Sequence, residues 1–148
     1  MKMQRPRRPS RFHLADTAQQ IVGGFLLAGP FVVTEEVWML AVDLTALQAL
    51  ATIAVVFAIG YATLYKADPT RDQSEETTIA GIPIRFISLM GVSFGSVAIL
   101  AILFGAPDTF IAESESNLST VLITFRAVTL GSVFSVVGAA TADTLFSK

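Results

Sequence analysis

The sequence contains no cysteine, one histidine and few charged residues, and each shortage removes a class of function. Without cysteine the chain forms no disulfide and offers no thiolate to an iron–sulfur cluster or a structural zinc ion. The single histidine, His13, stands outside every apolar segment, which excludes a histidine-bound haem or metal in the apolar part of one chain. We therefore expect no cofactor.

Charged residues make up only 15% of the chain, whereas soluble domains carry about 25%. Hydrophobic residues reach 53%, and the mean hydropathy is +0.64. Because a domain of 148 residues cannot hide this much apolar surface from water, we expect it to lie in a lipid bilayer. The net charge is -2 and no basic stripe runs along the chain, so nucleic acid is excluded as a partner.

Long apolar segments predict an all-α fold, a bundle of four transmembrane helices. Roughly 20 apolar residues cross the hydrocarbon layer, and residues 45–65 provide 21 without a formal charge. The helices are predicted at about 15–44, 45–65, 84–104 and 119–145, after a basic arm at 1–13, so that 14–148 form one transmembrane domain.

The positions of lysine and arginine predict the orientation. These residues occur in the 1–13 arm, around the middle loop at Lys66, Arg71 and Arg85, and at Lys148, while the other two linkers contain none. The positive-inside rule then places both termini in the cytoplasm and the chain in the cell membrane. The alternative is a cleaved signal peptide over 1–29, which we disfavour because no small-residue cleavage site follows it cleanly.

Small residues spaced three or four apart predict where the helices pack, since close backbone contact holds helices together in lipid. The positions concerned are Gly24, Ala28, Ser88, Gly91, Gly95, Gly131, Ser135 and Gly138. We interpret them as packing within one chain, with a homo-oligomer interface as the alternative. Trp38, Tyr61 and Tyr65 are expected to anchor helices at the membrane interface.

The segment from Pro30 through Thr34 to Glu35 and Glu36 is the sharpest candidate site. Proline frees a backbone carbonyl, so two carboxylates and a carbonyl oxygen would gather over about two turns, as protons and hard cations prefer. No second motif defines a metal cage, so the metal is left open. In the alternative interpretation the first helix ends near Val33, and both glutamates are wet at the outer interface.

Arg126 is predicted to pair with Glu35 or Glu36. Arg126 and Glu36 each lie about seven residues, roughly 10 Å, below the outer boundary of the membrane, so the opposite charges are at matched depth. The alternatives for Arg126 are contact with lipid headgroups or with a neighbouring subunit. A second polar group, near the inner helix ends, comprises Asp16, Gln19, Gln20 and Asp143. We interpret that group as ordinary interfacial residues, with an inner polar cluster as the alternative.

Three segments carry a resemblance to a known family: RFHLADTAQQIVGGFLLAGPFVVTEEVW, RFISLMGVSFGSVA and FSVVGAATAD. In these segments the chain resembles an uncharacterised family of small four-helix integral membrane proteins from halophilic archaea, a domain of unknown function. The resemblance implies a membrane location and four helices, and it brings no functional residues.

We expect a small membrane protein that conducts or transports a cation or a proton through the Glu35 and Glu36 site, as a homo-oligomer. The alternative is a structural or regulatory subunit that acts with a partner membrane protein and transports nothing. An enzyme is not expected, because neither paired aspartates nor a serine–histidine arrangement stands at membrane depth.

Overall fold

A computed structural model describes residues 12–67 and 77–146, which fold mainly into helices. The elements are α1 (Leu14–Val32), α2 (Glu35–Asp43), α3 (Ala46–Tyr61), the π-helix η1 (Ala62–Lys66), β1 (Thr78–Ile79), β2 (Ile82–Pro83), α4 (Ile84–Leu103), α5 (Ala106–Phe110) and α6 (Asn117–Phe146). The predicted basic arm at 1–13 lies mostly outside the described residues.

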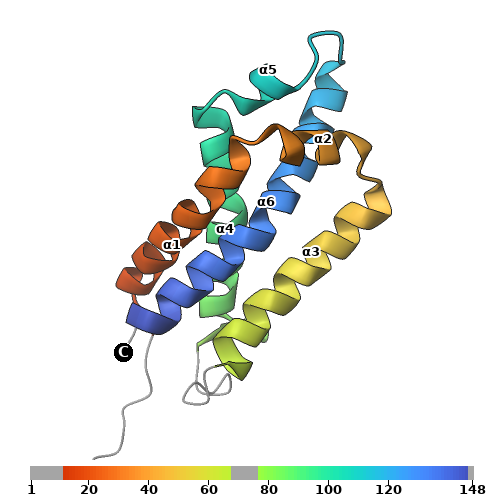
Figure 1. Cartoon of the computed structure of the whole chain (residues 1–148). Coiled ribbons are helices and arrows are strands. Elements are labelled where there is room, and N and C mark those ends of the chain that lie inside the picture. The colour runs from red at the N-terminus through yellow and green to blue at the C-terminus, as the bar shows by residue number, and fades with distance from the viewer. Residues whose placement is uncertain (1–11, 68–76, 147–148) are drawn as a thin grey trace, which may run out of the picture.

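Figure 1 shows α1, α3, α4 and α6 running along the length of the bundle, with α2 and α5 at one end. We call that end the α2 end, and the opposite end, where α1 begins and α6 ends, the terminal end. The long helix α6 packs against α1, α3 and α4, whereas α3 contacts α4 much less than it contacts α6. The core therefore forms around α6.

The predicted fold class, a helical membrane bundle, is confirmed. Three helical segments are long and apolar enough to cross a membrane: Ala46–Lys66, Ile84–Leu103 and Asn117–Phe146. Helices α1 and α2 meet this criterion only together, with a bend of 81° between them. The described residues thus supply three spans, or four where the bent pair counts as one.

The bend between α1 and α2 replaces the continuous helix expected over 15–44. Pro30 lies within α1, and the chain leaves the helix three residues later, at Val33. The amide and the hydroxyl of Thr34 both donate to the carbonyl of Phe31, at 3.2 and 2.8 Å, which satisfies one of the carbonyls left open at the helix end. The first helix therefore ends at Val32, close to the Val33 of the alternative interpretation.

Trp38 lies in the core, although its type and position predicted an interfacial anchor. Only 2% of the residue is exposed, its ring stacks on Phe110 at a centroid distance of 5.9 Å, and its indole nitrogen donates to the carbonyl of Val32 at 2.9 Å. A second open carbonyl of α1 is thereby satisfied by a side chain of α2. Trp38 thus fixes the direction in which α2 leaves α1.

Glycine allows the closest approach in the bundle, between α1 and α6. A Cβ atom added to Gly23 would collide with the carbonyl oxygen of Gly138, and one added to Gly138 would collide with that of Gly23. One residue further along α1, a Cβ on Gly24 would lie 3.0 Å from Oγ of Ser96 and 3.2 Å from Oγ of Ser135. These two helices can pack so tightly only because side chains are missing at their crossing.

The other predicted packing residues divide into two groups. Ala28 and Ser135 are fully buried, and a Cβ on Gly131 would lie 2.7 Å from a methyl group of Val97. By contrast, a Cβ added to Gly91 or Gly95 would meet no described atom within 4 Å. The Gly91 and Gly95 face of α4 is thus open in a single chain.

Short segments end the helices. Gly105, two residues after the end of α4, adopts a left-handed conformation with φ 63°. Ser116 precedes α6 and caps it, because its hydroxyl accepts the amide of Ser119 at 3.2 Å. Part of the predicted middle loop is a tight hairpin, in which β1 and β2 join through Ala80 and Gly81, both with positive φ.

Candidate functional site

Three ionisable side chains are buried together at the terminal end of the bundle. Asp16, in the first turn of α1, is 6% exposed; Arg85, the second residue of α4, is 1% exposed; and Asp143, near the end of α6, is fully buried. We call these three residues the charge cluster. Burial of charged groups is costly, so their mutual arrangement decides what the site can do.

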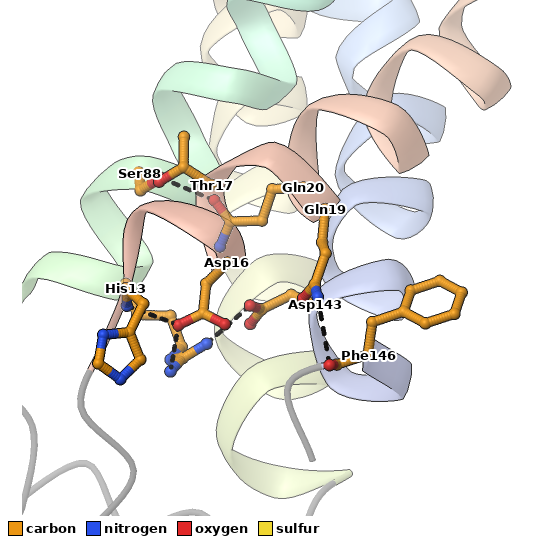
Figure 2. Close-up of polar contacts among 9 residues, drawn as sticks. His13, Asp16, Thr17, Gln19, Gln20, Ser88, Asp143 and Phe146 are labelled. Atoms are coloured by element: carbon orange, nitrogen blue, oxygen red, sulfur yellow. Dashed lines mark hydrogen bonds and ion pairs between the residues drawn. The ribbon is translucent and has the colours of Figure 1, made fainter.

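Arg85 lies between the two carboxylates (Figure 2). Its Nη1 donates to Oδ1 of Asp143 at 2.7 Å, and its Nη2 donates to Oδ2 of Asp16 at 3.4 Å. The ring of Phe12 covers the guanidinium at 5.2 Å from its centroid, an arrangement that favours a cation. Arg85 therefore connects α1 to α6 from its position on α4.

Helix dipoles explain why Arg85 and Asp143 depend on each other. Arg85 stands at the positive end of α4 and Asp143 in the last turn at the negative end of α6, so each charge is disfavoured by its own helix. Their short, charge-assisted hydrogen bond offsets both effects.

Asp16 is held by the start of its own helix. The amide of His13, the residue that caps α1, donates to Oδ2 of Asp16 at 2.7 Å. An acidic residue three positions after the cap favours this contact and also suits the positive end of the helix. The local sequence thus orients this carboxylate independently of its contact with Arg85.

Polar side chains continue from the charge cluster toward the middle of the bundle. Ser88 donates to Oε1 of Gln20 at 2.7 Å, and the hydroxyls of Thr17 and Ser88 lie 3.2 Å apart. Deeper in, the hydroxyl of Ser135 donates to the carbonyl of Gly24 at 3.2 Å. We call these groups the polar track. Gly24 lies eight residues after Asp16, so the track rises about 12 Å along α1.

Beyond Gly24 the same interface becomes apolar. Ala28, Val32, Trp38, Val97 and Ala101 are among the buried residues that fill the bundle toward the α2 end. The polar track is therefore closed at one end by a packed core, and the charge cluster lies at its other end.

The predicted Glu35 and Glu36 site lies elsewhere, at the α2 end. Both glutamates are exposed in the first turn of α2, where the helix dipole favours a carboxylate. Thr34 is half-buried and its hydroxyl faces back to Phe31, while Pro30 stays inside α1. The bend ends the first helix before the glutamates and turns them away from its axis.

Arg126 is half-buried on α6, and within the described part of the chain it forms no ion pair with Glu35 or Glu36. The prediction rested on equal depth along straight helices, and the bend after Val32 changes where the glutamates lie.

The second predicted polar group is the one that the structure brings together. Asp16, Gln20 and Asp143 are buried at the terminal end, and the amide nitrogen of Gln19 contacts the carbonyl of Phe146 at 3.2 Å. Sequence reasoning missed Arg85, which was counted only as a charge of the middle loop. An arginine at the start of an apolar helix, opposite two aspartates at other helix ends, was the available signal.

The described residues of the charge cluster do not form a metal-binding site. Among the residues that the structure describes, no three histidine or acidic side chains come close enough to hold a metal ion. The guanidinium between Asp16 and Asp143 occupies the place where a cation would bridge them. The guanidinium thus takes the place of a metal ion between the two carboxylates.

One comparison with known proteins supports the membrane location. A family model described as "Putative integral membrane protein (DUF2391)" matches residues 2–144. Neither a curated protein nor a solved structure matches the chain.

Proposed function

The chain belongs to the DUF2391 family of integral membrane proteins, and we propose that it moves a proton or a small cation across the membrane between α1, α4 and α6. One observation carries this proposal: two carboxylates, Asp16 and Asp143, are buried among apolar helices beside the polar track. Ionisable groups are costly at such positions, and in membrane proteins they mark ion and proton pathways.

In the proposed route, the proton or cation passes Glu35 and Glu36 at the end of the bundle opposite the charge cluster. They are exposed carboxylates at the α2 end, where a proton or cation would enter or leave the apolar core. Because packed residues such as Val32 and Trp38 separate them from the polar track, passage requires α1 to shift against α6. The bend between α1 and α2 offers a hinge for such a shift.

Ion flux in liposomes tests this function. The purified chain should carry protons or alkali cations down an imposed gradient, and Asp16→Asn should reduce that flux at least tenfold. The double variant Glu35→Gln and Glu36→Gln should also reduce it, because the outer carboxylates would no longer concentrate cations. Entrapped pH-sensitive and cation-sensitive dyes measure the two fluxes separately.

Asp43→Asn is the matched control for that measurement, because Asp43 is an exposed aspartate at the end of α2. Its flux should equal that of the unchanged chain. Equal flux in liposomes with and without the protein would remove the transport proposal.

A structural or regulatory subunit is the second candidate function. The open Gly91 and Gly95 face of α4 favours it, since glycines at this spacing suit close packing against another helix in the membrane. In that case the chain acts through a homo-oligomer or a partner membrane subunit. Absence of flux, together with stable assembly in the membrane, would support this function. Neither candidate is an enzyme.

The proposed setting is the cell membrane, with both termini in the cytoplasm, as the positive-inside rule predicts. The halophilic archaeal source implied by the resemblance stays a prediction.

Cysteine labelling tests the orientation, and the chain has no cysteine of its own to interfere. In intact cells, a membrane-impermeant thiol reagent should label Ser114→Cys, which is exposed at the α2 end. It should label Ser10→Cys and Ser74→Cys, which lie outside the described residues, only after the membrane is opened. Labelling of Ser74→Cys in intact cells would reverse the orientation.

A further inference from the structure

The polar track contains a buried amide group that is only half satisfied. Gln20 is fully buried, and its Oε1 accepts the hydroxyl of Ser88 at 2.7 Å. Its Nε2, which carries two donor hydrogens, has no hydrogen-bond partner in the described chain. A buried donor without a partner is destabilising, so a group that accepts from it is expected.

Asp16 lies one helical turn before Gln20, on the same face of α1. Its Oδ2 accepts from His13 and Arg85, whereas its Oδ1 accepts no hydrogen bond from the described residues. In Figure 2 the amide nitrogen of Gln20 points toward the side on which Asp16 lies. The buried donor of Gln20 thus points toward the Asp16 side chain, whose Oδ1 has no hydrogen-bond partner among the described residues.

We propose that one water molecule bridges Nε2 of Gln20 and Oδ1 of Asp16, and that the ion handled at this site is a proton. Water accepts from the amide and donates to the carboxylate, so a single molecule satisfies both groups. A metal cation would instead face the N–H donors of Gln20 and the positive charge of Arg85. This inference rests on the proposed transport function and names its ion.

The proton transfer at this site is simple and balanced. A hydronium ion that reaches the bridging position gives one proton to the carboxylate of Asp16, which leaves a neutral water molecule and a carboxylic acid. The charged groups that face Asp16 are Arg85 from α4 and Asp143 from α6, and the amide of His13 contacts it from its own helix. Gln20 positions the water and is not itself protonated.

Infrared difference spectroscopy on the full-length protein in liposomes tests the water site. Exchange of H₂¹⁶O for H₂¹⁸O should reveal a band of one strongly held water, and Gln20→Leu and Asp16→Asn should each abolish that band. Gln48→Leu is the control, because Gln48 is an exposed glutamine at the start of α3, at the opposite end of the bundle from the polar track. It should keep the band.

Proton flux is measured on the same samples. Gln20→Leu should lower the proton flux at least tenfold, whereas Gln48→Leu should leave it unchanged, and sodium added in excess should not compete. Where Gln20→Leu fails to fold, Gln20→Asn replaces it, since a side chain shorter by one methylene withdraws the amide while keeping its polarity.

The outcomes separate this inference from the transport function. A water band that persists in the Gln20 variants overturns the bridge, even where flux is present. Competition by sodium overturns the proton assignment and leaves transport of a cation standing. Loss of the band in Gln20→Leu without flux in the unchanged protein supports the water site and removes transport.

Discussion

Asp143→Asn is expected to lower the free energy of unfolding by about 3–5 kcal/mol, the typical cost of removing one partner from a buried ion pair. Asp143 is fully buried and Arg85 is 1% exposed, so water cannot replace the lost carboxylate. Arg85 would then remain buried at the positive end of α4, where its charge is already disfavoured. The change is measured by unfolding the protein in mixed micelles with increasing amounts of a denaturing detergent, while the loss of helix is recorded.

The double variant Arg85→Met and Asp143→Leu should recover most of that loss. Both charges of this pair are then absent, and apolar side chains of similar length fill their space, an exchange that is often neutral or stabilising. Asp16 loses Arg85 in this variant but keeps the hydrogen bond from the amide of His13. The control Asp43→Asn changes an exposed aspartate and should stay within about 0.5 kcal/mol. A double variant as unstable as Asp143→Asn alone would show that the cluster does not depend on the pairing of these two charges.

The helical membrane bundle could be predicted because lipid leaves few alternatives. Apolar segments of about 20 residues must be helical to satisfy their backbone groups, and the segments 84–104 and 119–145 fall close to α4 and α6. The bend after Val32 was harder to predict, since proline is tolerated inside membrane helices. The break depends on Thr34 and on the indole of Trp38, whose partners become visible only in three dimensions.

The charge cluster could be predicted only in part. Asp16 and Gln20 stand one turn apart on α1, so their common face is readable from spacing. Arg85 and Asp143 are 58 positions apart in the chain, and their contact requires that α4 and α6 run antiparallel with matching ends. Charge near a helix end predicts exposure by default, and only the packing of α1, α4 and α6 buries these groups.

The packing role of each glycine could also be predicted only in part. Spacing alone treats Gly91 and Gly95 like Gly131 and Gly138, since all could serve close packing. Contact with a neighbouring helix separates them, because Gly138 meets the backbone of α1 while Gly91 meets nothing within 4 Å. The sequence pattern could not tell which small-residue face turns toward α6.

Because of that difference, we expect the change from glycine to alanine to stabilise the chain at Gly91 and to destabilise it at Gly138. Alanine is more favourable than glycine inside a helix by about 1 kcal/mol, so Gly91→Ala should stabilise the chain by up to that amount. Gly138→Ala gains the same propensity, but its new Cβ would collide with the carbonyl oxygen of Gly23. Because that oxygen belongs to the backbone, the whole of α1 must move away from α6.

The cost of overpacking is typically about 1–3 kcal/mol, and a backbone collision falls at the upper end of that range. Gly138→Ala should therefore destabilise the bundle by about 1–2 kcal/mol after its gain in helix propensity is subtracted. Gly23→Ala should do the same, because its Cβ would meet the carbonyl oxygen of Gly138. The midpoint of thermal unfolding in detergent, followed by helicity, ranks the three variants.

Equal stability of Gly91→Ala and Gly138→Ala would contradict the tight crossing of α1 and α6. Destabilisation by Gly91→Ala alone would instead place a second helix, from another subunit, against the open face of α4. The expected order, with Gly91→Ala most stable and the two crossing variants least stable, requires that the crossing of α1 and α6 at Gly23 and Gly138 holds one chain together. The same crossing lies where the polar track ends against the apolar core, beside Gly24. Its stiffness therefore also sets how easily α1 can shift to open the proposed route.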